Sequence, residues 1–245
     1  MMKCISYNRA KVKRLKERQR SLVGLLSLIL IVSSNKSYSS TCYGTSSSGY
    51  LTGGVELPRD GDNFTTYSDI ARVTGRTYVH AEVRDIIIEA YEALIISHPE
   101  KVYKYAETGL KEGGKFSPHK THQNGLSVDF MTPVINELGE SVHLPTFPWN
   151  RFGYDIEFDA SDQFKDLSID YLALAAHIVE LDKVARKRGY KLWRVIFAPE
   201  LQAGLLATPY AEYIRENIQL SNKRSWVRHD EHYHVDFEIP CESRE

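Results

Sequence analysis

The stretch HDEHYHVDFEI, residues 229–239, crowds three histidines into six positions and continues as alternating polar and apolar residues. Alternation with a period of two predicts a β-strand, because residues two apart in a strand lie on one face. A strand over 232–239 would carry three polar side chains on one face and three apolar ones on the other: His232, His234 and Asp236 against Tyr233, Val235 and Phe237. Neighbouring imidazoles on one face suit a metal ion, although two ordinary surface histidines are the alternative for an isolated His-x-His.

A second stretch, HKTHQNGLSVDF at 119–130, supplies the residue types that this pair lacks. His122 and Asp129 lie seven positions apart, and Gly125 between them allows the chain to turn back. A loop histidine can therefore face an aspartate on the strand that follows. Two imidazoles and a carboxylate, with water as the fourth ligand, are the donors from which catalytic zinc sites are built.

Hydrophobic periodicity and helix caps predict the remaining elements. Helices are expected over 79–98, 167–189 and 208–220, and strands over 126–130, 190–198 and 232–239. Thr208 and Pro209 would begin the third helix, and Gly189 would end the second. Residues 134–166 show no period and are expected to form an insertion loop. We therefore expect an α+β fold, in which a small antiparallel sheet carries the metal site between flanking helices.

Charge is spread unevenly along the 245 residues. Residues 1–20 carry eight Lys or Arg against one Glu, and Lys36 adds a further positive charge. Because the whole chain has a net charge of −1, residues 41–245 carry about −9. An acidic body argues against a nucleic-acid partner, which would be held by neutralising its phosphates.

The basic start is followed by the apolar run LVGLLSLILIV at 22–32 and then by SSNKSYSS. This order predicts a secretory signal peptide over 1–40, cleaved near Ser40. The apolar run is too short to span a bilayer of about 30 Å comfortably, so no stable membrane span is expected after cleavage. An uncleaved signal anchor is the alternative. The mature chain, residues 41–245, would form a single domain that is periplasmic or secreted.

Cysteine usage agrees with export. Cys4 lies in the predicted signal peptide, which leaves Cys42 and Cys241 near the two ends of the mature chain. An even number of cysteines in an exported protein permits one disulfide bond between them. Two unrelated thiols are the alternative.

The segments GGKFSPHKTHQNGLSVDF at 113–130 and HDEHYHVDFEIPC at 229–241 resemble the two signatures of the penicillin-insensitive murein endopeptidases. This family belongs to a wider group of zinc peptidases that includes lysostaphin and the D-Ala-D-Ala carboxypeptidases. The group's pattern is a histidine, an aspartate seven residues later, and a distant His-x-His. Both halves of the pattern occur here in the same order and at the same spacing.

The resemblance implies a role for each matched residue. The zinc ligands would be His122, Asp129 and His234. His232, the first histidine of the His-x-His pair, would be the catalytic histidine beside the zinc, and His229 would also line the site.

Three features leave parts of this site open. Family members can bind a second metal ion, and His119 matches one of its ligands, but its remaining ligands cannot be assigned. Residues 134–166 depart from the family pattern. Asp236 stands where a family member can carry Arg, so it either alters the charge near the substrate or is a solvated strand residue.

The resemblance implies hydrolysis of peptidoglycan cross-links, at the bond between D-Ala and diaminopimelate. A zinc-bound water would attack the amide, and His232 would take the proton of the water or stabilise the oxyanion. Two glycines and three aromatic residues would shape a groove for the stem peptide, unless the aromatic residues pack in the core: Gly113, Gly114, Trp149, Phe152 and Tyr154.

Two other functions use the same residues. A D,D- or L,D-carboxypeptidase would act on a free peptide end, with Glu231 as a base, although a strand would point Glu231 away from His232. A non-catalytic wall-binding zinc protein would keep the fold and the metal without turnover.

Overall fold

The computed structural model describes residues 39–223, 225 and 227–244 of the chain. The predicted signal peptide over 1–40 lies almost entirely outside these described residues, so its cleavage near Ser40 stays a prediction. Within the described ranges, no helix is long and apolar enough to cross a membrane.

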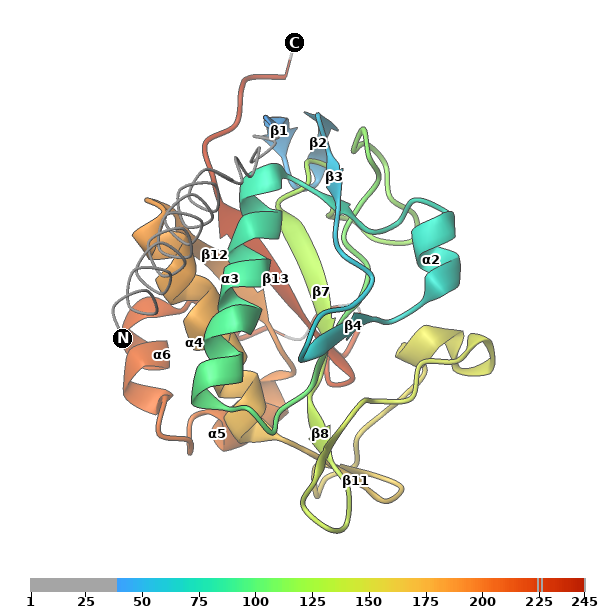
Figure 1. The fold of residues 1–245 in the computed structure, drawn as a ribbon, viewed down its shortest axis with the longest axis vertical. Coiled ribbons are helices and arrows are strands. Elements are labelled where there is room, and N and C mark those ends of the chain that lie inside the picture. Colours follow the sequence, from blue (N-terminus) through green and yellow to red (C-terminus); the bar gives the residue numbers. More distant parts are fainter. Residues whose placement is uncertain (1–38, 224, 226, 245) are drawn as a thin grey trace, which may run out of the picture. The chain divides into compact units, whose positions relative to one another are not determined.

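A five-stranded sheet carries both stretches that the sequence singled out (Figure 1). Its strands lie in the order β12 (Lys191–Ile196), β13 (His232–Glu238), β7 (Ser127–Met131), β6 (Tyr103–Tyr105) and β4 (Phe64–Thr66). Neighbouring strands are antiparallel except β6 and β4, which pair in parallel. The predicted antiparallel sheet is therefore confirmed, with one parallel pair at its edge.

Two helices, α3 (Ala81–Ser97) and α4 (Tyr171–Lys187), lie side by side over one face of this sheet (Figure 1). The apolar face of α3 follows helical spacing and is buried at Val83, Ile86, Ile87, Ala90 and Leu94. Burial contributes about 1.5–3 kcal/mol for each large aliphatic side chain, so this packing holds the helix on the sheet. The site residues lie on the opposite face of the sheet.

Helix α4 begins later than predicted because Asp170 caps it. The Asp170 carboxylate accepts a hydrogen bond from Ala173 N at 3.0 Å, and residues before it form the short strand β11 (Leu167–Ile169). The predicted stop is confirmed, since Gly189 has a φ of 85° just past the helix. Such a left-handed residue terminates a helix at little cost when it is glycine.

The third predicted helix is shorter than expected. It appears as α6 (Ala211–Asn217), and Tyr210 rather than Thr208 occupies its N-cap. Thr208 instead lies in the turn after α5 (Gln202–Leu205), where its hydroxyl donates to Leu205 O at 2.9 Å. The same hydroxyl accepts a hydrogen bond from Tyr210 N at 3.3 Å, so Thr208 stabilises the turn before α6 and not the first turn of the helix itself.

Residues 134–166 are more ordered than the predicted loop. They contain β8 (Val134–Ile135), β9 (Ser141–Val142), the 3₁₀ segment η1 (Pro148–Gly153) and β10 (Gln163–Phe164). With β11, the three strands form a second sheet in the order β10-β11-β8-β9. Strands of two or three residues leave no readable period in the sequence, which is why the pattern did not indicate them.

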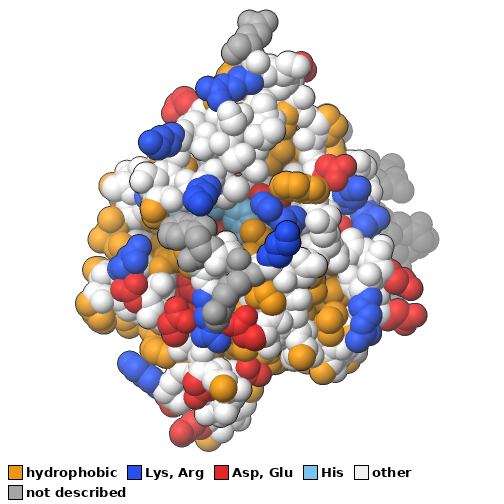
Figure 2. All heavy atoms as spheres, turned by 180° about the vertical axis from the view of Figure 1, so that it is seen from behind, with side chains coloured by type: hydrophobic (Ala, Val, Ile, Leu, Met, Phe, Trp, Pro, Cys, Tyr) orange, Lys and Arg blue, Asp and Glu red, His pale blue; other side chains and the backbone are white. Residues whose placement is uncertain are grey.

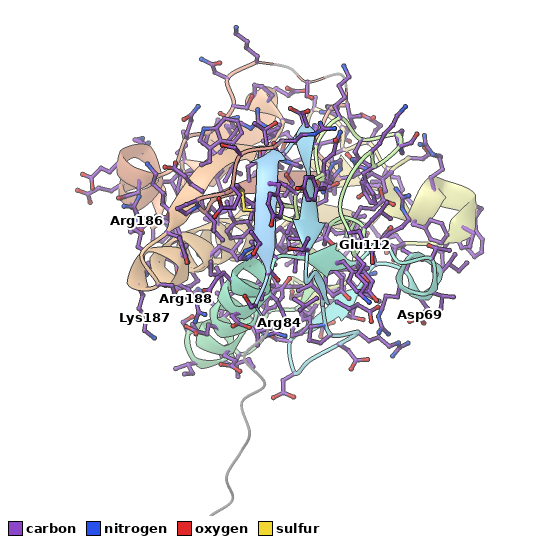
Figure 3. All side chains as sticks on the ribbon, turned by 90° about the horizontal axis from the view of Figure 1, so that it is seen from above. Asp69, Arg84, Glu112, Arg186, Lys187 and Arg188 are labelled. Carbon is purple, nitrogen blue, oxygen red and sulfur yellow. A yellow bond between two sulfur atoms is a disulfide. The ribbon has the colours of Figure 1, made fainter. Side chains whose placement is uncertain are left out.

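Smaller elements complete the described chain. They are the hairpin β1 (Thr41–Thr45) and β2 (Ser48–Thr52), the paired β3 (Val55–Glu56) and β5 (Tyr78–Val79), α2 (Asp69–Val73) and η2 (Pro199–Leu201). The predicted disulfide between Cys42 and Cys241 is confirmed and appears as a yellow bond in Figure 3. It joins β1 to the segment that follows β13, and cross-links over long loops typically stabilise a fold by about 2–4 kcal/mol.

Arg188, at the end of α4, makes most of the ion pairs between the two long helices, and Lys187 adds one to Glu89 at 3.8 Å. The Arg188 guanidinium lies 2.9 Å from Glu82 and 2.7 Å from Glu89, both on α3. Figure 3 labels Arg188 beside its neighbours at this end of α4. Partly exposed pairs of this kind contribute little each, so apolar packing remains the main link between α3 and α4.

Candidate metal centre

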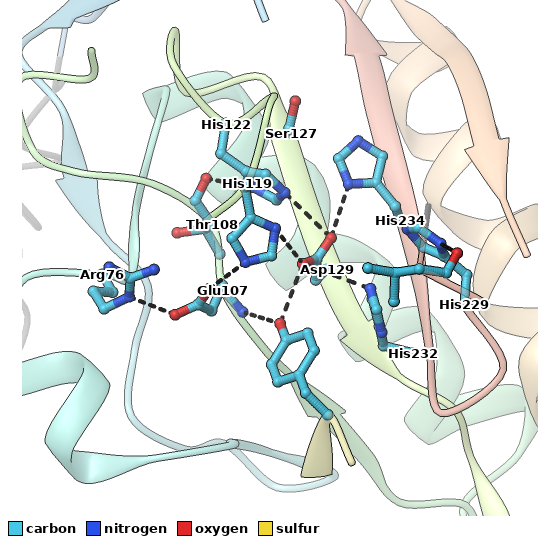
Figure 4. Close-up of polar contacts among 12 residues, drawn as sticks. Arg76, Glu107, Thr108, His119, His122, Ser127, Asp129, His229, His232 and His234 are labelled. Carbon is cyan, nitrogen blue, oxygen red and sulfur yellow. Dashed lines mark hydrogen bonds and ion pairs between the residues drawn. The ribbon is translucent and has the colours of Figure 1, made fainter. Parts of the chain in front are cut away.

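The sheet register places Asp129 directly beside His234. The two residues are opposite each other on β7 and β13, and His234 Nδ1 lies 2.8 Å from Asp129 Oδ1. Both side chains are buried, with relative exposures of 3% for His234 and 0% for Asp129. The predicted alternation of β13 is therefore confirmed at the level of side-chain contacts (Figure 4).

His122 reaches the same carboxylate from a loop. Its backbone has a φ of 67°, and Gly125 with a φ of 77° follows in the turn. A Cβ at Gly125 would lie 2.8 Å from His80 N, so only glycine fits this close approach. The loop brings His122 Nε2 to 3.3 Å from Asp129 Oδ1. The meeting of the early loop with the final strand, on which the sequence interpretation depended, is present in the structure.

Each of these rings has one nitrogen bound to an acceptor outside the cluster. His122 Nδ1 donates to Thr108 O at 2.9 Å, and His234 Nε2 donates to Asp236 Oδ1 at 2.9 Å. An outer acceptor fixes the tautomer and leaves the lone pair of the inner nitrogen facing Asp129. His122 Nε2 is buried and has no hydrogen-bond partner among the described residues.

His119 and His232 show the same arrangement around the second carboxylate oxygen. His119 Nε2 contacts Glu107, and its Nδ1 lies 3.7 Å from Asp129 Oδ2. His232 Nδ1 donates to Glu231 Oε1 at 2.6 Å, and its Nε2 lies 3.9 Å from Asp129 Oδ2. Four imidazoles therefore turn an inner nitrogen towards one carboxylate.

The contact of Glu231 with His232 differs from the expectation for a strand residue. Glu231 precedes β13, so the period of two does not govern its side chain. It is 1% exposed and does not line the cavity described below. Glu231 can therefore orient His232 but cannot reach a substrate as a base.

Tyr154 was interpreted only as a groove or core residue, but it contacts the centre directly. Its hydroxyl donates to Asp129 Oδ2 at 3.1 Å and accepts from Glu107 N at 3.4 Å. It comes from the insertion at 134–166, where no pattern in the sequence distinguishes one aromatic residue from another. Glu107 was missed for the same reason: it follows the short strand β6, and neither its partner Arg76 nor its partner His119 is close in sequence.

The carboxylates around the inner imidazole nitrogens favour a positive charge at this centre. Burial lowers the pKa of His234, but Asp236 and Asp129 outweigh this effect and raise the pKa to about 10. Burial favours the neutral form of Asp129, but its interactions with His122 and His232 outweigh this effect and hold the pKa of Asp129 well below its usual range. Inner lone pairs that face a carboxylate repel it unless a proton or metal ion lies between them.

At His229 the effect of burial on the pKa dominates, unlike at His234. Burial lowers the pKa of His229 to about 4, so this ring is neutral near pH 7. Its Nδ1 donates to Val227 O at 2.8 Å, and its ring lies 4.6 Å from that of His232. The backbone φ of 60° at His229 is left-handed, as at His122. Such strained backbone costs on the order of 1–3 kcal/mol and is concentrated at functional sites.

A cavity of about 530 Å³ opens over the centre. His119, His229, His232 and His234 all line it, whereas His122 and Asp129 lie beneath its floor. Figure 2 shows the histidines in a hollow with Lys and Arg side chains around it. This volume is within the range of small-molecule and peptide sites.

Two of the five residues expected to shape a groove line this cavity, and the other three do not. Phe152 and Tyr154 line the cavity, but Trp149 is 78% exposed and lies outside it. Gly113 and Gly114 do not line it either. A Cβ at Gly113 would lie 2.2 Å from Gln123 O, so this glycine is required for packing of the histidine loop.

The donor set fits a metal ion. His119, His122 and Asp129 each offer a ligand atom within 4.8 Å of the others, and His234 Nδ1 adds a fourth beside Asp129. The 3.3 Å between His122 Nε2 and Asp129 Oδ1 matches the spacing of two ligands about 2.0–2.1 Å from a tetrahedral zinc. The unpartnered Nε2 is itself an indication, because buried polar atoms are otherwise satisfied.

A buried carboxylate ringed by inward imidazole nitrogens, under an open cavity, is a metal-binding donor set that a substrate can reach. The comparison with family models gives the class of protein, a metallopeptidase. The family model described as penicillin-insensitive murein endopeptidase matches residues 42–245, which is most of the chain. The protein belongs to this family, whose substrate is peptidoglycan. A comparison with curated proteins found no match.

Proposed function

We propose that this protein is a zinc-dependent endopeptidase that hydrolyses the amide cross-link between D-Ala and diaminopimelate in neighbouring peptidoglycan stems. The family membership supports peptidoglycan as the substrate. The observation that carries the proposal is the convergence of four inner imidazole nitrogens on Asp129 beneath the cavity. A closed structural zinc site would not leave its histidines lining an open cavity.

The proposed zinc ligands are His122 Nε2, Asp129 and His234 Nδ1. When bound, the zinc would lower the pKa of a coordinated water towards neutrality and polarise a carbonyl oxygen. A mixed set of nitrogen and oxygen donors favours zinc over magnesium or calcium. His119 Nδ1 faces the other oxygen of Asp129 and is the proposed ligand for any second ion.

His232 is the proposed catalytic histidine. Because its Nδ1 is bound to Glu231, Nε2 is the atom that would accept the proton of the attacking water and deliver it to the leaving amine. Glu231 would hold the ring in this orientation and stabilise the imidazolium that forms. Neutral His229, whose ring lies tilted against that of His232 at the cavity wall, would contact the substrate through Nε2.

We further propose that the protein acts outside the cytoplasm, in the periplasm or as a secreted enzyme. The disulfide between Cys42 and Cys241 supports this location, because such bonds persist in oxidising compartments. The predicted signal peptide is the route by which the chain would reach it.

Purified cross-linked muropeptide dimers test the function directly. The enzyme, with and without a chelator, is incubated with the dimers and the products are separated by mass. Conversion of dimer to monomer that stops in chelator and returns with added zinc is the expected result.

The other outcomes identify the alternatives. Release of a terminal D-Ala with the dimer left intact would mean a carboxypeptidase. Binding of the dimer with no new product, at zinc contents near one ion per chain, would mean a wall-binding protein. Cleavage that persists after complete removal of metal would contradict the metal centre itself.

A further inference from the structure

The charged residues that line the cavity favour an anionic ligand. Three of them are cationic, namely Lys120, Arg151 and Arg194, and one, Glu107, is anionic. Glu107 is already paired with Arg76 and with His119. The cavity therefore presents positive charge to whatever enters it.

Among these cations, Arg194 has the most fixed position. It lies on β12 opposite Asp236, and both its Nε and its Nη2 donate to Asp236 Oδ2, the former at 2.9 Å. Asp236 is itself 1% exposed and held by Ser127 Oγ at 2.6 Å and by His234. The guanidinium is thus attached through a buried carboxylate to the ring of a proposed metal ligand.

One end of this guanidinium remains available. Arg194 keeps 27% of its side chain exposed, and its Nη1 makes no hydrogen bond to any described residue. A planar guanidinium fixed on one edge offers its remaining N–H groups at low entropic cost. Arg151 is less restrained, because its side chain is 69% exposed and its single ion pair among the described residues, 3.4 Å long, is with Asp155, which is 47% exposed.

We propose that Arg194 binds a free carboxylate of the substrate next to the scissile bond, and that Asp236 is its positioning residue. This inference rests on the proposed function. In the proposed cross-link, the nitrogen that leaves belongs to a carbon that also bears a free carboxylate. Ile196, two residues after Arg194, is the cross-strand neighbour of His234, so a carboxylate held at Arg194 lies beside the metal centre along the same face.

The proposal gives the enzyme a chemical preference. A cross-link whose diaminopimelate carboxyl group is free would bind well, and one in which this group is amidated would bind poorly. A hydrogen bond to a charged group contributes about 1.5–3 kcal/mol, which corresponds to roughly a 10–100-fold change in KM. The effect falls on binding, so kcat should change much less than KM.

Two synthetic cross-linked peptides, with this carboxyl either free or amidated, provide the experiment. The native enzyme should show a KM about 10–100-fold lower for the free acid. Arg194→Met should raise KM for the free acid by the same factor and leave KM for the amide nearly unchanged, so that the preference disappears. Arg194→Lys, which keeps the charge but not the planar shape, should restore part of it.

Arg151→Met is the matched control, because it also removes one positive charge from the cavity wall. It should keep the ratio of the two KM values, and zinc content measured after dialysis should be the same in all variants. If Arg151→Met lost the difference between the two KM values and Arg194→Met kept it, the carboxylate site would lie at Arg151, and the assignment to Arg194 would be overturned.

Equal KM values for the two peptides in the native enzyme would overturn the inference while leaving the endopeptidase function standing. Cleavage of neither peptide would instead overturn the proposed function, and the carboxylate site with it. If Arg194→Met fails to fold, the two KM values of the native enzyme still show whether a carboxylate is recognised. A reduced ratio of these KM values in Arg194→Lys then shows whether Arg194 is the residue that binds it.

Discussion

Two buried histidines lie on opposite faces of strand β13, His234 on the strand itself and His177 on α4, and their neighbours have opposite effects on their charge. On one face, His234 lies between Asp129 and Asp236, and these carboxylates raise its pKa to about 10 against the opposing effect of burial. On the other face, His177 of α4 is equally buried but lies among aromatic rings, and burial lowers its pKa to about 3. Its Nδ1 contacts the hydroxyl of Tyr233, the residue between the two histidines of the His-x-His pair.

The comparison shows which surroundings allow a buried histidine to carry a positive charge. Burial alone leaves His177 neutral and inert within the core, whereas two carboxylates make His234 favour a positive charge. One strand can border both the carboxylate cluster and the aromatic core because its alternate residues face opposite sides. Substitutions on one face of β13 should therefore leave the residues on the other face in place.

The largest effect is expected from His122→Ala. Loss of a ligand should weaken zinc binding by more than the roughly 10–100-fold that removal of an outer partner costs, and turnover should vanish. Metal content after dialysis and cleavage of muropeptide dimers measure both. His177→Phe is the control on the other face and should retain its zinc. Equal zinc retention by both variants would contradict the proposed ligand set.

His232→Ala should separate metal binding from catalysis. The variant should keep its zinc and lose about 10²–10⁴-fold in kcat, the usual contribution of general acid–base catalysis. Glu231→Gln should lose less, because it only orients the His232 ring through Nδ1. Full activity in His232→Ala would remove this residue from the catalytic role.

A smaller effect is expected from Asp236→Asn, which keeps the shape of the outer partner of His234. Zinc affinity, measured by competition with a chelator, should fall by about 10–100-fold. Asp182→Asn is a matched control, because Asp182 is also fully buried and is held by Arg186 and by the hydroxyl of Tyr213. It should lower stability without changing zinc affinity, and similar losses in the two variants would reduce Asp236 to a structural role.

The sequence predicted the parts of this centre that depend on local geometry. Alternation over 232–239 placed His232, His234 and Asp236 on one face, and the turn at Gly125 accounted for the approach of His122. Of the two alternatives for Asp236, a solvated strand residue is wrong, because the side chain is 1% exposed.

What the sequence could not predict comes from pairings between distant segments. Arg194 faces Asp236 only because β12 pairs with β13, and Tyr154 reaches Asp129 from an insertion without period. Glu107 meets His119 across a loop of the chain for the same reason. Sheet register and loop paths set these contacts, and neither leaves a local pattern in residue order.

The smallest expected effect concerns the core face and the dependence of stability on pH. His177 has a pKa of about 3 in the folded chain and about 6.5 when unfolded, so between these values the unfolded chain binds the extra proton. Its contribution to the free energy of unfolding is therefore complete above pH 6.5 and decreases as pH falls, by at most about 1.4 kcal/mol per pH unit. His177→Phe keeps a flat ring against Tyr91 and should remove this slope.

Urea unfolding from pH 7 to pH 4 measures the change, with the difference between variant and native chain taken at each pH. Leaving the Tyr233 hydroxyl unpaired costs the same free energy at every pH, so it changes the size of this difference but not its dependence on pH. The proposed metal ligands titrate alike in both proteins and do not contribute to the difference. Tyr91→Phe alters the same aromatic cluster without removing an imidazole, so it should leave the native slope unchanged. A native slope retained by His177→Phe would mean that the core histidine already carries its proton in the folded state. In that case aromatic surroundings would tolerate the charge, and the carboxylates beside His234 would no longer explain why the two faces of β13 differ.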